Sequence, residues 1–295
     1  MLLTSCTLCP RRCAARREPT RGWGRCGMGM LPVVARAAPH FGEEPCISGT
    51  RGSGAVFFSG CPLGCVYCQN YALSHDGQGR EVSVERLSEI FRQLEAQGAH
   101  NINLVNPTHF VPAIRRALLL RRPGVPVVYN SSGYERVRTL RALEGLVDVY
   151  LPDFKYADAD AARVYSDAPD YPQVALAAIQ EMCRQTGAPR YDANGLMTRG
   201  TLVRHLILPG LTGASMRALN LLRERLPAGT PVSLMGQYTP CGEAAKYPGM
   251  NRRITRREYA RVRAHMLAIG LTEGYVQDLS AADEAYIPAF DGTGL

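Results

Sequence analysis

Short apolar runs alternate with amphipathic stretches from residue 54 onward. The apolar runs are typical of buried β-strands, whereas the amphipathic stretches repeat their apolar residues at helical spacing. The predicted strands are residues 54–58, 101–105, 125–129, 148–151, 201–208 and 231–235. The predicted helices are residues 84–94, 112–120, 137–143, 174–186, 214–226 and 255–269. This alternation of strands and helices predicts an α/β protein with a parallel sheet or barrel.

Two of these helices carry a recognisable signal at their first turn. Ser83 precedes the helix at 84–94, and a serine hydroxyl at this position accepts a hydrogen bond from the first helical turn. Thr255 and Glu258 have the T-x-x-E spacing of a capping box, which predicts the start of the last helix.

Polar residues collect immediately after the predicted strands. In barrels of parallel strands the chemistry is carried by loops that follow the strand C-termini. The segments at such positions are 61–68, 106–109, 130–132, 153–155 and 237–238. Arg204 and His205 fit this rule less well, because they lie inside the strand predicted at 201–208. We therefore expect one site, built from several of these strand ends.

Three cysteines share the first of these loops. Cys61, Cys65 and Cys68 have the spacing C-x3-C-x2-C directly after a buried strand. Thiolates are the usual ligands of four-iron clusters, and three of them leave one iron open to another molecule. The alternatives are a structural zinc knuckle, which usually needs a fourth ligand nearby, and buried thiols without a role.

The N-terminal 50 residues differ from the rest of the chain in composition. Cys6, Cys9, Cys13 and Cys26 suffice for a closed tetrathiolate site, and too few apolar residues lie between them for an independent core. Zinc and a second [4Fe–4S] cluster both suit four cysteines, and thiols without metal are the third possibility. We therefore divide the chain into a cysteine-rich segment at 1–50 and an α/β domain at 51–295.

Composition limits the other possibilities. Ten cysteines, mostly in tight groups, indicate metal ligation in a reducing compartment rather than disulfides. The net charge is +8, but the arginines are spread over predicted helices without interleaved aromatics, so we regard a nucleic-acid partner as unlikely. No apolar run is long enough to span a membrane, and the first residues lack the apolar core of a signal peptide. We expect a cytoplasmic protein.

The cysteine loop, with Tyr67 just before its last cysteine, resembles that of the radical S-adenosylmethionine (radical SAM) superfamily. Within this superfamily the chain is most similar to paralogues of the pyruvate formate-lyase activating enzyme that carry an N-terminal cysteine segment. The similar segments are 6–13, 44–49, 57–70, 101–108, 129–135, 151–156, 204–210 and 237–240. The resemblance implies a partial (β/α)6 barrel preceded by a small cysteine-rich metal-binding segment.

The resemblance also implies roles for individual residues. Cys61, Cys65 and Cys68 would bind three irons of a [4Fe–4S] cluster, and Tyr67 would lie against the adenine of SAM. The other residues that match cofactor-binding positions are Asn106, Thr108, Asn130, Ser131, Asp153, Lys155 and Arg204. Asp153 and Lys155 would also lie near the substrate and are the candidate catalytic residues.

Several of these positions depart from the activating enzyme. Residues 106–108 replace a Gly-Gly-Glu segment that holds the amine of SAM, so Asn106, Thr108 or backbone carbonyls would make that contact. Asn130 and Ser131 replace an Asp-Thr pair that helps to bind a monovalent cation, and asparagine is the weaker ligand.

The implied reaction is reductive cleavage of SAM to a 5′-deoxyadenosyl radical, which abstracts hydrogen from a substrate. A reductant protein such as flavodoxin or ferredoxin would supply the electron. The substrate would be a glycyl radical enzyme, as for the activating enzymes, or alternatively another peptide or a small molecule. A non-catalytic, zinc-binding regulatory protein is the alternative from another class.

Overall fold

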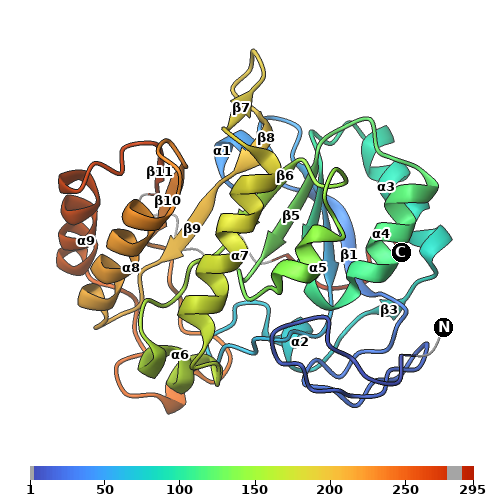
Figure 1. Cartoon of the computed structure of the whole chain (residues 1–295), viewed down its shortest axis with the longest axis horizontal. Coiled ribbons are helices and arrows are strands. Elements are labelled where there is room, and N and C mark those ends of the chain that lie inside the picture. Colours follow the sequence, from blue (N-terminus) through green and yellow to red (C-terminus); the bar gives the residue numbers. More distant parts are fainter. Residues whose placement is uncertain (1–2, 278–287) are drawn as a thin grey trace.

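The computed structural model describes residues 3–277 and 288–295 of the chain (Figure 1). Its strands form an eight-stranded sheet in the order β3-β1-β2-β4-β5-β6-β8-β7 and a three-stranded sheet in the order β11-β10-β9. The strands are β1 Val33–His40, β2 Ser53–Phe58, β3 Arg80–Glu81, β4 Ile102–Val105, β5 Val127–Ser131, β6 Val149–Pro152, β7 Arg190–Tyr191, β8 Met197–Thr201, β9 Val203–Leu206, β10 Val232–Met235 and β11 Gly274–Val276. Neighbours from β2 through β6 to β8 are parallel, as are β9, β10 and β11.

The two sheets meet where β6 lies beside β9. Asp153 and Arg204 form a parallel bridge there, and the Phe154 amide donates to the Arg204 carbonyl at 2.8 Å. The parallel strands β2, β4, β5, β6, β9 and β10 therefore follow one another, and each is followed by a helix before the next begins. The predicted α/β class with a partial barrel is confirmed.

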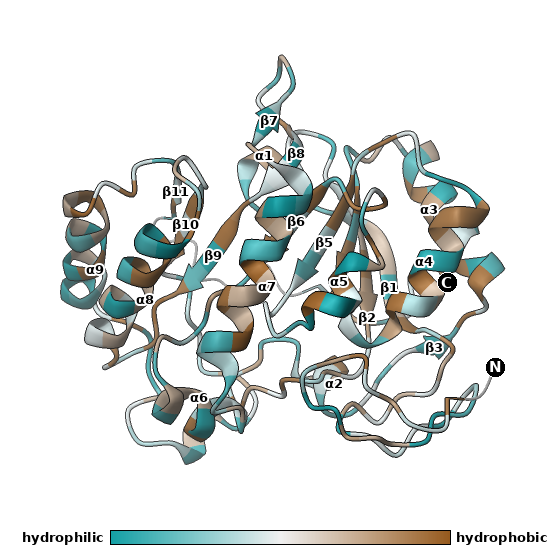
Figure 2. Cartoon of the chain, viewed as in Figure 1, coloured by the Kyte–Doolittle hydropathy of each residue, from teal (hydrophilic) through white to brown (hydrophobic). Residues whose placement is uncertain are grey.

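The helices form an arc around the outside of the strands in chain order, from α3 to α9 (Figure 1). They are α1 Pro45–Ser48, α2 Tyr71–Ser74, α3 Val84–Ala96, α4 Val111–Leu120, α5 Val137–Arg141, α6 Ala159–Ser166, α7 Tyr171–Thr186, α8 Thr212–Arg225 and α9 Arg256–Ala268, with 3-10 turns η1 Thr108–Phe110 and η2 Ala244–Lys246. The main apolar core lies between the strands and α3, α4 and α7. In Figure 2 the strands are largely hydrophobic, and the helices alternate between hydrophobic and hydrophilic residues. This is the pattern expected of helices that cover a buried sheet.

Both predicted helix starts are confirmed. The Ser83 hydroxyl accepts a hydrogen bond from the Arg86 amide at 3.0 Å. Thr255 and Glu258 make both hydrogen bonds of the capping box at the start of α9.

Two predicted strands differ from the observed ones. The single strand predicted at 201–208 is two strands, β8 and β9, because the chain changes partners at Leu202. The Leu202 amide donates to Tyr150 of β6, whereas the next amide, from Val203, donates to Pro231 just before β10. The strand predicted at 125–129 begins and ends two residues later, so Asn130 and Ser131 belong to β5 rather than to the turn after it.

Residues 33–40 lie within the segment predicted as cysteine-rich but form β1, which is antiparallel to β2 in the main sheet. The division of the chain at residue 50 stays a prediction, and the irregular part that carries the four cysteines is shorter. We call residues 3–32 the N-terminal loop; Figure 1 shows it in dark blue below the sheet, beside α2. The C-terminal residues run along β1, where the Ala37 amide donates to the Thr293 carbonyl at 2.9 Å.

Candidate active site

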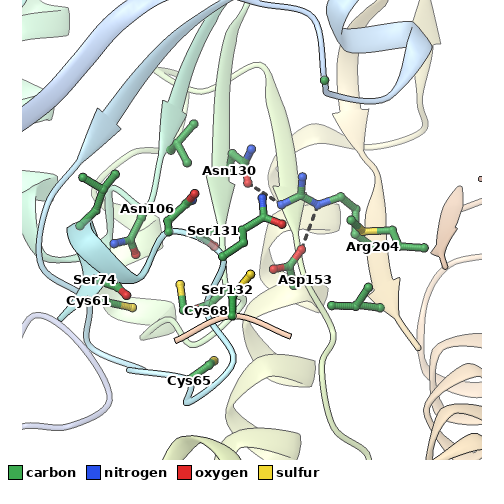
Figure 3. A pocket seen from close by; sticks show the side chains of 18 of the residues that line it. Cys61, Cys65, Cys68, Ser74, Asn106, Asn130, Ser131, Ser132, Asp153 and Arg204 are labelled. Atoms are coloured by element: carbon green, nitrogen blue, oxygen red, sulfur yellow. Dashed lines mark hydrogen bonds and ion pairs between the residues drawn. The ribbon is translucent and has the colours of Figure 1, made fainter. Parts of the chain in front are cut away.

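A cavity of about 220 Å³ lies at the carboxyl ends of the parallel strands. Its lining includes every residue predicted for the main site except Thr108: Cys61, Cys65, Tyr67, Cys68, Asn106, Asn130, Ser131, Asp153, Lys155 and Arg204. Figure 3 shows the three cysteines on one side of this pocket and Asn130, Asp153 and Arg204 on the other. Residues from five separate strand ends therefore meet in one place.

The cysteines are carried by the segment at 59–70, which we call the cysteine loop. It leaves the fully buried strand β2 and turns at Gly60 and Gly64, whose φ angles of 76° and 67° are in the left-handed region. Burial, followed by the neighbouring cysteines, raises the pKa of Cys61 to about 12. Burial likewise raises the pKa of the Cys68 thiol to about 11. The thiols are thus unfavourable places for an isolated negative charge, and a bound metal would supply the positive charge that thiolates need there.

The opposite side of the cavity holds a network of charges around Arg204. Its guanidinium donates to Asp153 Oδ1 at 2.9 Å, Glu43 Oε2 at 2.9 Å and Asn130 Oδ1 at 2.6 Å. Lys155 Nζ donates to the other oxygen of Asp153 at 2.6 Å. Burial alone would raise the pKa of Asp153, but the Arg204 and Lys155 cations reverse this and hold it below its usual value. The Asp153 carboxylate therefore stays ionised between two cations.

Two acidic residues beside Arg204 are not predicted from the sequence as part of the site. Glu43 precedes α1, lines the cavity and accepts hydrogen bonds from the side-chain amides of Asn103 at 3.0 Å and Asn130 at 2.9 Å. Glu44 also lines the cavity, and burial raises its pKa although Arg204 opposes the shift. The only signal in the sequence was the segment 44–49, to which the resemblance assigned no role.

Thr108 does not reach the cavity. Asn106 has a φ of 59°, which turns the chain at the end of β4, and the 3-10 turn η1 follows. The Thr108 hydroxyl instead donates to the fully buried Glu135 carboxylate at 2.5 Å. Neighbouring His109 is also buried and bonds through Nε2 to the Ser59 carbonyl. This arrangement therefore does not favour a contact between Thr108 and a ligand in the cavity.

Tyr67 lines the cavity but is anchored in the core. Its hydroxyl lies 2.8 Å from that of Tyr156, and its ring packs against those of Tyr165 and Tyr238. Burial holds the pKa of Tyr67 well above its usual value. The phenol is thus neutral, and the residue fixes the cysteine loop against α6 and the loop after β10.

The four N-terminal cysteines lie in one region of the N-terminal loop. Cys6 and Cys9 are buried, and burial raises the pKa of Cys9 to about 11, with further contributions from Cys26 and Cys6. Cys26 in turn is influenced by Cys6 and Cys13. Within residues 3–277 and 288–295, no three Cys, His, Asp or Glu side chains are arranged to hold a single metal ion. A cubane cluster spaces its ligands more widely than one ion does, because each thiolate binds a different iron.

The cavity suits a cluster together with a polar ligand. Three soft sulfur donors occupy one side, and paired acidic and basic groups occupy the other. The side-chain oxygens of Asn70 and Gln277 are buried without a hydrogen-bond partner, and both residues line the cavity. Such buried orphan acceptors are costly unless a donor reaches them.

A family model described as the radical SAM superfamily matches residues 55–222, which is more than half of the 295 residues. The chain belongs to the radical SAM superfamily. Membership implies a [4Fe–4S] cluster and SAM as cofactors, and the matched range contains the cysteine loop.

An uncharacterized protein of Methanocaldococcus jannaschii, MJ0674, is 27% identical over 290 residues, which cover 94% of this chain and 77% of that protein. A radical SAM methyltransferase from Sphaerobacter thermophilus has a similar structure, with a TM-score of 0.52, 18% identity and coverage of 76% of this chain and 66% of its own. SuiB from Streptococcus suis has a TM-score of 0.50, 9% identity and coverage of 77% and 48%.

The chain spans less than two thirds of the length of these two solved structures, and at such identities they show the fold alone. None of the three matches is described as an activating enzyme of pyruvate formate-lyase, so that finer resemblance stays a prediction. No helix in the described part of the chain is long and apolar enough to cross a membrane.

Proposed function

We propose that this protein is a radical SAM enzyme whose cluster is held by Cys61, Cys65 and Cys68. The observation that carries this proposal is that the three cysteines face the same cavity as the Asp153–Lys155–Arg204 network. When bound, the cluster and SAM supply a 5′-deoxyadenosyl radical, which abstracts a hydrogen atom from the substrate.

The chain's own residues would bind and orient SAM. Asp153, held ionised by its two cations, offers a carboxylate to an amine, and Lys155 offers an ammonium group to a carboxylate. Asn106, Asn130 and Ser131 add neutral polar groups along the strand ends. Because Arg204 also contacts Glu43 and Asn130, it fixes the distance between β9 and the loop after β1. A fixed polar wall of this kind replaces water around a charged ligand without reorganising.

We further propose that Cys6, Cys9, Cys13 and Cys26 bind a metal, either a second [4Fe–4S] cluster in the observed arrangement or zinc once the thiols have moved closer together. Support comes from their mutual proximity and from the burial of Cys6 and Cys9. If the metal is a cluster, it would relay the electron to the cysteine loop. Changing Cys6 and Cys9 to Ala should then lower the iron content, and unchanged iron content would argue against the relay.

A reductant protein is the proposed partner, and the charge of one surface supports this. A hollow of about 780 Å³ lies beside Thr7 and Leu8 of the N-terminal loop. Its arginines are Arg115, Arg116, Arg136, Arg138 and Arg141, and Glu144 is its one acidic residue. An acidic electron-transfer protein has the complementary charge.

This surface can be tested separately from the chemistry. Changing Arg115 and Arg138 to Glu should lower the rate with an acidic flavodoxin about 10-fold at low salt. The rate with dithionite, which needs no docking surface, should not change. Arg257→Glu, an exposed arginine of α9, is the control. Equal effects on both reductants would contradict the docking proposal.

For the substrate, we propose a glycine in a partner protein as the first to test, because the similar segments extend over nearly the whole chain. Another peptide or a small molecule is the alternative. An electron paramagnetic resonance signal of a glycyl radical in an added partner would favour the first. Formation of 5′-deoxyadenosine without that signal would favour the second.

The central experiment is to purify the protein without oxygen, reconstitute and reduce it, and measure 5′-deoxyadenosine from SAM. Changing Cys61, Cys65 and Cys68 together to Ala should abolish the product. Cys183→Ala, a buried cysteine on α7 outside the cavity, is the matched control and should retain it. Zinc in place of iron, with no product from the wild-type protein, would instead identify the non-catalytic zinc-binding protein.

A further inference from the structure

Arg17, in the N-terminal loop, is a buried cation with no carboxylate beside it. Its side chain is among the largest that are fully buried, with 2% of the residue exposed. Its guanidinium donates to the carbonyls of Met28, Gly29 and His109 and lies over the Phe110 ring. Among the ion pairs of residues 3–277 and 288–295, none involves Arg17.

A buried cation of this kind is normally paired with a negative charge. Arginine stays protonated in proteins, so it cannot avoid the cost of burial by losing its charge. Carbonyl oxygens satisfy its donors but do not neutralise it, and buried charges are otherwise paired or bound to metal centres. The other buried arginine described above, Arg204, has two carboxylates at 2.9 Å. Arg17 instead has the sulfur atom of Cys6 nearby.

Of the four N-terminal cysteines, Cys6 is in position to supply this charge. Cys6 Sγ lies 3.9 Å from Arg17 Nη1. Neutral thiols would leave the guanidinium uncompensated. Four thiolates, however, outweigh the charge of a zinc ion or of a doubly charged cluster core, so either centre would be anionic.

We propose that Arg17 is the buried counter-cation of an anionic metal–thiolate centre formed by Cys6, Cys9, Cys13 and Cys26. This rests on the metal binding proposed above for these cysteines. Arg17 is a positioning residue in this scheme, since it acts on the metal through the thiolates. Its bonds to Met28, Gly29 and His109 hold it between the N-terminal loop and η1, so it faces the centre from a fixed place.

The test uses the full chain with Cys61, Cys65 and Cys68 changed to Ala, so that any bound metal belongs to the N-terminal cysteines. Metal analysis identifies iron or zinc, and chelator competition measures how tightly it is held. The expected result is one loaded centre per chain, with an affinity that falls about 10- to 100-fold in Arg17→Met, as when other groups that support metal ligands are removed. Arg17→Lys, which keeps the charge, should retain more of the affinity. Arg16→Met, one residue away and exposed, should leave it unchanged.

A purely structural role for Arg17 makes a different prediction. If the side chain only tied three carbonyls together, Arg17→Met would lower the unfolding temperature equally with and without metal. A counter-cation matters more when the thiolates are present, so the loss should be larger in the loaded protein than in the metal-free protein.

The outcomes separate this inference from the proposed function. Metal bound with the same affinity in wild type and Arg17→Met, or equal losses of stability in the two states, would overturn the role of Arg17. No metal at all would overturn the N-terminal centre too. In either case 5′-deoxyadenosine formation by the wild-type protein would still stand on its own measurement.

Discussion

Gly60 is one position where the N-terminal loop and the cysteine loop touch, and a single added methyl group tests that contact. It directly precedes Cys61 and has a φ of 76°. A Cβ at Gly60 would overlap Met28 Cγ and would lie 2.7 Å from the Cys26 carbonyl oxygen. The methionine side chain can move aside, but the carbonyl belongs to the backbone.

The loss of stability expected in Gly60→Ala is the sum of two free-energy costs. An alanine in the left-handed region costs about 1–2 kcal/mol relative to glycine. Forcing an extra methyl group into a packed site costs about 1–3 kcal/mol more. Gly60→Ala should therefore lower the free energy of unfolding by about 2–5 kcal/mol in total.

A second glycine separates these costs. Gly195 has a φ of 78°, and a Cβ there would have nothing within 4 Å. Gly195→Ala should therefore show only the backbone cost, about 1–2 kcal/mol. Urea unfolding of both variants without oxygen, at equal metal loading, measures the difference between them.

The same pair of variants also reports on function. Relief of the clash would displace Cys61 or Cys26, so 5′-deoxyadenosine formation should fall in Gly60→Ala and persist in Gly195→Ala. Equal losses of stability in the two variants would refute the reasoning, because they would show that the N-terminal loop does not press on Gly60.

Three further changes probe other parts of the molecule. Asp153→Asn should destabilise the protein by about 3 kcal/mol at neutral pH, because it leaves two buried cations short of a partner. The folded pKa of Asp153 is lowered, so this stability is present above the carboxyl's ordinary pKa of 3.8 and is lost as pH falls through the folded value. Wild type and variant should therefore converge in urea unfolding measured at acid pH. Burial raises the pKa of Glu135 from 4.5 to about 7, so its ionisation should cost the folded state about 3 kcal/mol as pH rises through this window, and Glu135→Gln should remove that pH dependence. Thr255→Ala should cost about 1 kcal/mol by removing the cap of α9, and Thr255→Ser should restore most of it, as thermal unfolding would show.

The repeating units and the cysteine loop were predictable because their signals are local. The apolar faces of α3 and α9 and their capping residues occupy consecutive positions, and so do the cysteines of the loop. The strand β1 carried no such signal, since its sequence VVARAAPH is rich in alanine and contains a proline. It pairs antiparallel with β2, and no alternation of apolar and polar residues in its own sequence predicts this contact.

The charge network around Arg204 shows more clearly what could not be predicted from the sequence. Arg204 and Glu43 are 161 residues apart in the chain and 2.9 Å apart in space. No spacing rule links them, and Glu43 entered the site only because β1 and α1 place it there. Thr108 shows the opposite case, since it follows a strand end as expected but does not line the cavity, because the left-handed backbone of Asn106 turns the chain there. Sequence position predicted which end of the sheet carries the site, and backbone geometry decided which side chains face it.

The N-terminal loop supports the cysteine loop from outside the cavity and is not a separate appendage. Arg11 donates to the carbonyls of Pro62 and Leu63 in the cysteine loop, at 2.8 and 3.0 Å, and to that of Ser166 at 2.8 Å. The Ser166 hydroxyl in turn donates to Cys65 Sγ at 3.1 Å. Because a loop with so little apolar core would depend on the proposed metal for order, loss of that metal should release these contacts together. The proposed N-terminal centre and the proposed catalytic cluster should therefore be coupled through the backbone, whether or not electrons pass between them.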